Sequence, residues 1–124
     1  MQNFAFAFEI VKLDDEKRLV GGIVYEPDVV DSQGDSASAE EIEKACHRYV
    51  KESRQINLMH KESAGEKVDI VECYITRAPM QIGNKVVKAG TWMIVVKVND
   101  DEIWKKVKSG EWTGFSMGGR ARAG

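Results

Sequence analysis

A serine near the end of the sequence lies among glycines, in the segment GEWTGFSMGGRAR at residues 110–122. If this segment is a strand, alternation puts Trp112, Gly114, Ser116 and Gly118 on one face. The neighbours of Ser116 on that face then carry no side chain. A nucleophile that attacks a peptide carbonyl needs such clearance, because the substrate backbone must approach to within about 3.5 Å. A glycine-rich strand that bends at the corner of a barrel gives the same pattern without any chemistry.

A serine hydroxyl is a weak nucleophile and needs a base. The sequence contains two histidines, His47 and His60. His60 follows Ile56 and Leu58 at a spacing of two, so it ends a predicted strand beside a polar turn. That position suits a base that must reach a substrate, and it also suits an ordinary strand-end histidine. His47 lies beside the apolar stripe of a predicted helix, where a solvated or capping histidine is the simpler interpretation.

A base histidine is usually oriented by an acceptor on its other ring nitrogen. Residues 117–124 contain no His, Asp or Glu, so no acceptor follows Ser116 within the sequence. Upstream, Glu72 is an acid on an otherwise apolar strand face, which Ile70 and Tyr74 share. A tight hairpin through residues 61–67 would pair His60 with about Val68 and leave Glu72 roughly 13 Å away. The acceptor that orients the base histidine is therefore left open among Glu72, His47, a water and a residue beyond position 124. The alternative for Glu72 is an edge-strand charge that faces water.

The elements that must position these residues follow from periodicity and capping signals. Period-two alternation and β-prone runs predict strands, whereas capping residues and apolar stripes predict two helices. The first helix should bury Ile42, Cys46, Tyr49 and Val50, and the second should bury Trp104. Strands are predicted over about residues 4–11, 19–25, 55–60, 68–76, 91–98 and 112–121, with helices over 38–53 and 101–108.

The order of these elements, β-β-α-β-β-β-α-β, has hairpin-sized connections and few crossovers. It predicts an α+β fold, a mostly antiparallel β-barrel or sheet with two helices packed outside. Gly21 and Gly22 inside the second strand predict a bulge, a bend or a close approach of two backbones.

Composition sets the broad class. The chain has 124 residues, 43% hydrophobic and 31% charged, which fits one globular domain over residues 1–124. The net charge of −2 argues against an electrostatic grip on nucleic acid. No apolar run approaches the roughly 20 residues that cross a membrane, and the first ten residues lack the features of a signal peptide. Cys46 and Cys73 are therefore expected to be reduced thiols in a cytosolic compartment.

No metal or cofactor is expected. The two cysteines and two histidines do not have zinc-finger spacing. The acids of the loop at residues 26–37, Asp28, Asp31 and Asp35, lack the ligand pattern of a calcium loop, and turn formation and helix capping explain them more simply.

Several segments in this order resemble the XkdF-type phage prohead (capsid maturation) serine proteases. They are EPDVVDSQGD at 26–35, INLMHKES at 56–63, GTWMIVVKV at 90–98 and DDEIWKKVKSGEWTGFSMGG at 100–119. The resemblance covers about residues 20–120. Such proteases are similar to the HK97-type prohead proteases and, more distantly, to the herpesvirus maturational proteases (assemblins). The run from Ser116 to Arg120 also resembles the nucleophile segment of assemblins.

The resemblance implies a herpesvirus-protease-like β-barrel with helices outside, with Ser116 as the nucleophile and His60 as the general base. The strands around His60 and Ser116 should then be neighbours in one sheet or barrel, because a base must lie within hydrogen-bond distance of its nucleophile. It implies a serine endopeptidase that needs no cofactor. Its substrates would be the scaffold and major capsid polypeptides of an assembling phage head, in the cytoplasm of the host bacterium. Assemblins act as dimers, so a homodimer is an expectation carried over from them. A catalytically inactive capsid-assembly or scaffold-binding domain with the same fold is the alternative.

The end of the sequence carries two further expectations. Assemblins take their third catalytic residue, a second histidine, from a strand after the serine. Its absence here is expected if the chain is the N-terminal part of a longer protein. The segment GGRARAG at residues 118–124 is expected to reach outward beyond about Arg120 and is a candidate site of self-processing.

Overall fold

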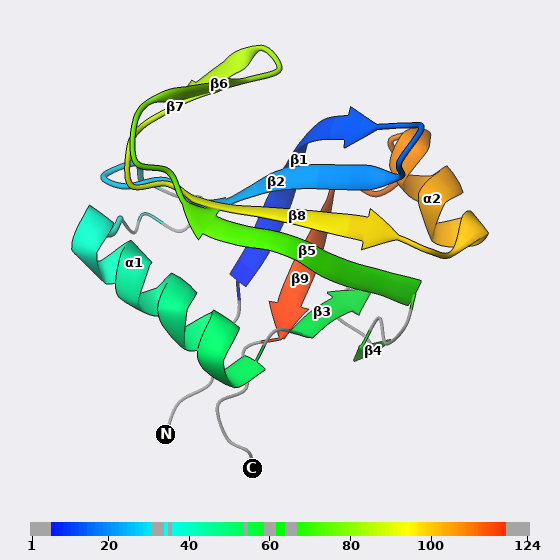
Figure 1. Ribbon diagram of the computed structural model, residues 1–124, viewed down its shortest axis with the longest axis horizontal. Coiled ribbons are helices and arrows are strands. Elements are labelled where there is room, and N and C mark those ends of the chain that lie inside the picture. Colours follow the sequence, from blue (N-terminus) through cyan, green and yellow to red (C-terminus); the bar gives the residue numbers. More distant parts are fainter. Residues whose placement is uncertain are drawn as a thin grey trace.

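The computed structural model of the chain describes residues 6–30, 34, 36–53, 55–58, 62–63 and 67–118, with the backbone alone at 6, 7, 53, 55–58, 62, 63 and 116–118. Figure 1 shows the arrangement of the elements. In chain order they are β1 (Phe6–Asp14), β2 (Leu19–Tyr25), α1 (Ala39–Arg48), the π-helical turn η1 (Tyr49–Ser53), β3 (Gln55–Leu58), β4 (Glu62–Ser63), β5 (Val68–Ile75), β6 (Met80–Ile82), β7 (Lys85–Val87), β8 (Trp92–Val98), α2 (Asp101–Lys108) and β9 (Gly114–Gly118).

The main sheet is antiparallel throughout and strongly curled. Its strand order is β4-β3-β9-β1-β2-β8-β5. In Figure 1, β9 and the first part of β1 run side by side and cross β2, β8 and β5 steeply, whereas the second part of β1 bends and runs along β2. The predicted α+β class and the antiparallel pairing are therefore confirmed. The sheet is a half-barrel, however, because its two edge strands, β4 and β5, do not pair with each other in the part of the chain that the structure describes.

The main core fills the inner face of the curl. Phe8 of β1, Trp92 and Ile94 of β8, and Phe115 of β9 are fully or almost fully buried there. Both helices pack against this core, as the apolar stripes predict. The buried helical side chains are Ile42, Cys46 and Tyr49 from α1 and η1, and Ile103, Trp104 and Val107 from α2.

Val50 was predicted to be buried with the first stripe, and that prediction is wrong. Its exposed fraction is 38%. The α-helix ends at Arg48, and the chain continues as the π-helical turn η1. A π turn holds more residues than an α turn, so the 3.6-residue spacing breaks and the position after Tyr49 rotates outward.

The two helices begin where their capping residues predict. The Ser38 hydroxyl accepts a hydrogen bond from the Glu41 amide at 3.2 Å, and the Glu41 carboxylate accepts one from the Ser38 amide at 2.9 Å. This is the reciprocal capping box at the start of α1. At α2 the Asp100 carboxylate accepts from the Ile103 amide at 3.0 Å. Each cap satisfies amides that the first helical turn leaves without a partner.

A short hairpin of β6 and β7 projects beyond one end of the main sheet (Figure 1). The strands predicted at residues 68–76 and 91–98 leave residues 77–90 as a connection, so this hairpin is an element that the sequence prediction lacks. The hairpin turns at Gly83 and Asn84, where Gly83 has φ of 60°. Its buried side chains, Ile82 and Val87, form a second small core with Ile23 and Met93. That core lies on the opposite face of β2 and β8 from the main core.

One glycine explains how tightly β1 and β2 approach. A Cβ atom on Gly22 would lie 2.1 Å from the ring of Phe8. The predicted close approach at the glycine pair is therefore confirmed, and Gly22 is the member that requires it. At Gly21 the nearest atom to such a Cβ would be 3.8 Å away.

Candidate functional site

The strand that carries the candidate nucleophile lies in the middle of one half of the sheet. β9 pairs with β1 on one side and with β3 on the other. Ser116 is opposite Ala7 of β1 and opposite Asn57 of β3. The strand leading to His60 and the strand carrying Ser116 were predicted to be neighbours, and this is confirmed. His60 itself lies outside the described residues, three positions after Asn57 in the sequence.

The glycine before the serine has a structural role. A Cβ atom on Gly114 would lie 2.4 Å from the carbonyl oxygen of Phe8. Because that oxygen belongs to the backbone of β1, it cannot swing aside. The absence of a side chain at this position is thus required by the approach of β1 to β9, independently of any substrate.

The core side of β9 is aromatic. Phe115 packs against Phe8 with ring centroids 5.3 Å apart, and edge-on against Trp112 at 6.2 Å. Trp112 was predicted to share a face with Gly114 and Ser116, opposite Phe115, and that prediction is wrong. The strand begins only at Gly114, so strict alternation does not extend back to Trp112.

Glu72, the predicted orienting acid, lies on β5 at the far edge of the sheet from β4. β1, β2 and β8 lie between β9 and β5 in the strand order, and the Glu72 side chain is exposed. Within the described residues β5 pairs with β8, while β3 pairs with β4 and β9, so β3 and β5 are not neighbours there.

The faces of β5 also differ from the prediction. The register of β5 against β8 shifts between Ile70 and Glu72. Ile70 packs against the main core, whereas Tyr74 packs against the small one. The predicted common face of Ile70, Glu72 and Tyr74 is therefore wrong, because a bulge inserts one residue and reverses the alternation.

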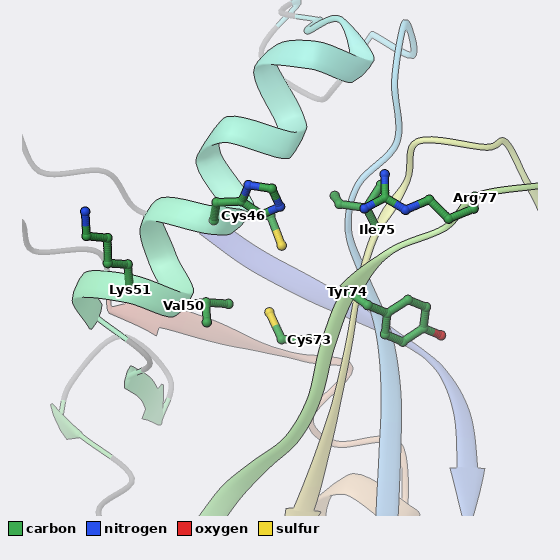
Figure 2. A pocket seen from close by; sticks show the side chains of 8 residues that line it. Cys46, Val50, Lys51, Cys73, Tyr74, Ile75 and Arg77 are labelled. Atoms are coloured by element: carbon green, nitrogen blue, oxygen red, sulfur yellow. The ribbon is translucent and has the colours of Figure 1, made fainter.

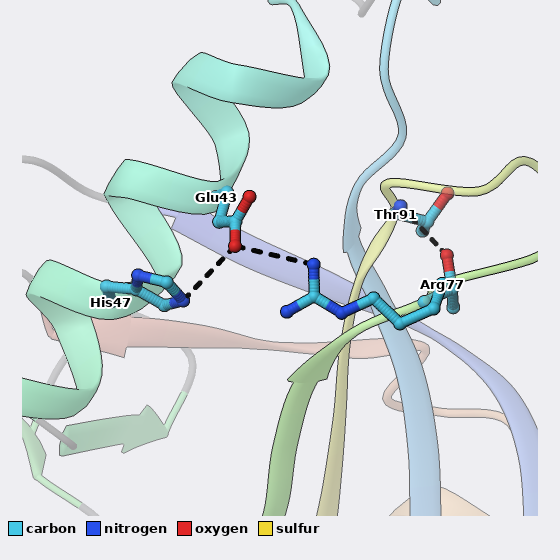
Figure 3. Close-up of polar contacts among 5 residues, drawn as sticks. Glu43, His47, Arg77 and Thr91 are labelled. Carbon is cyan, nitrogen blue, oxygen red and sulfur yellow. Dashed lines mark hydrogen bonds and ion pairs between the residues drawn. The ribbon is translucent and has the colours of Figure 1, made fainter.

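His47, the other histidine, belongs to the outer surface of α1 (Figure 3). Its Nε2 atom lies 3.7 Å from the Glu43 carboxylate. The same carboxylate accepts a hydrogen bond from Arg77 at 3.4 Å. This contact joins α1 to the end of β5, in a part of the molecule distinct from the β3–β9 pair.

The described part of the chain contains no helix long and apolar enough to cross a membrane. Within the same ranges, no three or more His, Cys, Asp or Glu side chains gather in a way that could hold a metal ion.

Two relatives from Bacillus subtilis (strain 168) are similar to the chain. The "Phage-like element PBSX protein XkdF" is 46% identical over 107 residues, which are 86% of this chain and 38% of that protein. The "Uncharacterized protein YqbD" is 44% identical over 112 residues, which are 90% of this chain and 34% of that protein. The chain thus spans little more than a third of the length of these relatives. No solved structure matches it.

The family described as "Putative phage serine protease XkdF" matches residues 7–123. The match includes β9, the segment leading to His60 and both helices. It extends to the first strand, β1, which the sequence resemblance did not include. The chain therefore belongs to this family of phage serine protease-like proteins.

Proposed function

We propose that this chain carries the catalytic site of a serine endopeptidase, with Ser116 as the nucleophile and His60 as the general base. The observation that carries the proposal is the pairing of β3 with β9, which sets Asn57 opposite Ser116. The register puts Asn57 on the same face as Ser116, so continued strand alternation would put His60 on the opposite face. The proposal therefore requires the chain to leave strand geometry after Leu58, where β3 ends. Three residues of extended chain span at most about 11 Å, which is enough for His60 to reach Ser116. Membership of a family named for serine proteases supports the same reaction.

The proposed reaction has two steps. The Ser116 hydroxyl oxygen attacks the scissile carbonyl carbon while His60 takes its proton, and the imidazolium then donates that proton to the departing amine. Water next attacks the acyl-enzyme, with His60 again accepting the proton, and the released Ser116 recovers its hydroxyl. No cofactor takes part in either step.

Glu72 is the proposed positioning residue for the His60 ring. Because β5 and β9 are separated along the sheet, this role requires Glu72 to act across the opening of the half-barrel between its edges. If so, Glu72→Gln should lower kcat by about 10²-fold or more and leave KM unchanged, whereas Glu72→Asp should recover part of the loss. A purely structural Glu72 would change the thermal stability of the protein without this split between kcat and KM.

The proposed substrates are the scaffold and major capsid polypeptides of an assembling phage head in the bacterial cytoplasm. These substrates are proposed because of the proposed relation to the HK97-type prohead proteases and the assemblins. The same relation leads us to propose that the protein forms a homodimer. The name of the PBSX relative supports a phage context.

A second candidate function is a capsid-assembly or scaffold-binding domain that keeps the fold but does not cut. Two observations favour it. Residues 117–124 offer no third catalytic side chain, and the upstream candidate Glu72 lies on the far edge strand.

A fluorophosphonate probe, which phosphonylates an activated serine, tests the proposal. Labelling should occur in the wild-type protein and in Ser36→Ala, a matched exposed serine, and should be lost in Ser116→Ala and in His60→Ala. The same four proteins should be incubated with scaffold and capsid polypeptides. Equal labelling of Ser116→Ala and the wild type would contradict the assignment of Ser116 as the nucleophile. Polypeptides that bind but stay intact, with no labelling at Ser116, would favour the assembly domain.

A further inference from the structure

Two cysteines far apart in the sequence meet between α1 and β5. Cys46 is buried on the inner side of α1, with 2% exposure, and Cys73 is half-buried on β5. Both are free thiols. Their sulfur atoms face each other in Figure 2, and the two side chains are hydrogen-bonded. The packing of α1 on the sheet edge therefore creates a pair of adjacent thiols.

The two thiols differ in character because Cys73 accepts two hydrogen bonds. One comes from Cys46 and the other from the indole Nε1 of Trp92 at 3.3 Å. The bond from Cys46, assisted by Trp92 and opposed by burial, lowers the pKa of Cys73 to about 7. Donating that bond, together with burial, raises the pKa of the Cys46 thiol. The pair therefore releases its first proton readily and holds its second.

A cavity of about 450 Å³ gives solvent and small molecules access to the pair. Both cysteines line it, and basic side chains stand around it: His47 from α1, Lys51 from η1 and Arg77 just after β5. Figure 2 shows Cys46 and Cys73 facing each other, with the Lys51 side chain pointing away from them. A partly accessible thiol with thiolate character is the setting in which cysteines react with oxidants, and here the hydrogen bonds from Cys46 and Trp92 supply that character.

We propose that Cys46 and Cys73 form an oxidation site for hydroperoxides, in which Cys73 is the attacking thiol and Cys46 the resolving thiol. The product is an intramolecular disulfide that joins α1 to β5. The covalent loop closed by this bond contains η1, β3 and β4. The proposal is independent of peptidase activity at Ser116.

The chemistry balances with hydrogen peroxide as the oxidant. The Cys73 thiolate attacks one peroxide oxygen, the O–O bond breaks, and the other oxygen leaves as hydroxide and is protonated to water. Cys73 is then a sulfenic acid. The Cys46 sulfur attacks the Cys73 sulfur, the S–S bond forms, the S–O bond breaks, and the hydroxyl leaves as water with the Cys46 proton. Two thiols lose two electrons and two protons, and one peroxide becomes two waters.

The test treats the folded, reduced chain with hydrogen peroxide and follows its intact mass and non-reducing peptide map. The wild type should lose two hydrogen atoms and yield a peptide pair cross-linked through Cys46 and Cys73. In Cys46→Ser, which keeps a hydrogen-bond donor but cannot resolve, Cys73 should stop at a sulfenic acid that dimedone traps. In Cys73→Ala, oxidation of Cys46 should be at least tenfold slower.

A measurement on the unsubstituted protein keeps the test independent of variant folding. Limiting iodoacetamide at pH 7 should alkylate Cys73 before Cys46. Three results would overturn the proposal. Iodoacetamide could alkylate Cys46 before Cys73, or peroxide could produce an intermolecular disulfide or no disulfide at all. Oxidation of Cys46 could also proceed at the same rate in the wild type and in Cys73→Ala.

Discussion

Ser116 and Cys73 both lie on strands of one sheet, but the two strands have different surroundings. β9 is paired on both sides, by β1 and β3, and a missing Cβ at Gly114 lets β1 approach it closely. β5 pairs with β8, and α1 packs over it beside a cavity of about 450 Å³. An added methyl group at Gly114 would clash with β1, whereas open space lies beside Cys73.

The two residues also depend on their neighbours differently. A serine hydroxyl needs a base that must be brought from another strand, here the one that leads to His60. The Cys73 thiol is made acidic by groups already in contact with it, Cys46 and Trp92. The acidity of the Cys73 thiol thus depends on hydrogen-bond donors that pack directly against it, whereas the Ser116 hydroxyl also needs a base that accepts its proton.

The largest expected effect tests whether the two sites are separate. Ser116→Ala should reduce peptidase activity by at least about 10³-fold, because it removes the nucleophile. Cys73→Ala should retain both activity and fluorophosphonate labelling. The measurement is the initial rate of cleavage of a capsid polypeptide. Loss of activity in Cys73→Ala, in a protein that still melts cooperatively, would mean that the two regions are coupled.

The second test concerns space. Gly114→Ala and Gly22→Ala should each lower the free energy of unfolding by about 1–3 kcal/mol, because each new methyl group meets packed atoms that cannot move away. Gly21→Ala is the matched control on β2 and should be neutral or slightly stabilising. Val50→Ile, which adds a methyl group beside the cavity, should change stability by less than about 0.5 kcal/mol. Urea denaturation midpoints measure all four, and equal midpoints for Gly114→Ala and Gly21→Ala would contradict the close approach.

The third test concerns pH. Because the thiolate is the reactive form, the rate of Cys73 alkylation should rise with pH and level off above its pKa of about 7. Cys46→Ala removes the main hydrogen-bond donor, so the midpoint should move up toward the ordinary thiol value. At pH 7 the thiolate fraction would then fall from about one half to about 3%, a roughly fifteenfold loss. Cys46→Ser should shift the midpoint less.

Other charged or titratable groups surround the thiol pair, and their contributions must be held constant in this experiment. They are Glu43 and His47 of α1, Tyr49 and Lys51 of η1, and Tyr74 and Arg77 at the end of β5. Identical midpoints in wild type, Cys46→Ala and Cys46→Ser would show that Cys46 does not set the acidity of Cys73.

The smallest expected effect tests whether the N-terminal cap of α1 influences the thiol pair on the buried face of that helix. Ser38→Ala removes the capping box and should lower the free energy of unfolding by about 1 kcal/mol. The pH midpoint of Cys73 alkylation should stay unchanged, because Cys46 is held by core packing about two turns further along. A shifted midpoint would mean that fraying at the start of α1 reaches the thiol pair.

Local signals in the sequence predict the elements well where capping and periodicity agree. β2 and α2 have the predicted bounds because alternation marks the strand and Asp100 caps the helix. The β6–β7 hairpin was missed although its signal is present: two short β-prone runs are separated by exactly Gly83 and Asn84. Pro79 nearby made the region resemble a plain connection.

The site was predictable only in part. The Gly-Phe-Ser segment indicates a candidate nucleophile, and the pairing of its strand with the one leading to His60 was correctly expected. The strand neighbours of β5 and the contact between Cys46 and Cys73 could not be predicted, and the reason is the same for both. Both depend on which elements far apart in sequence pack together, and no local pattern of residues encodes that choice.

The adjacency of β1 and β9 has a consequence for the timing of folding. β1 ends at Asp14, and its partner β9 begins at Gly114, so a ribosome must add about 100 residues before the two can pair. At typical bacterial rates of about 5–20 residues per second, β1 waits some 5–20 s for that partner. The strand with Ser116 is also the last of the described strands to be synthesised. During translation, therefore, the half-barrel gains its candidate nucleophile only after every other described strand already exists.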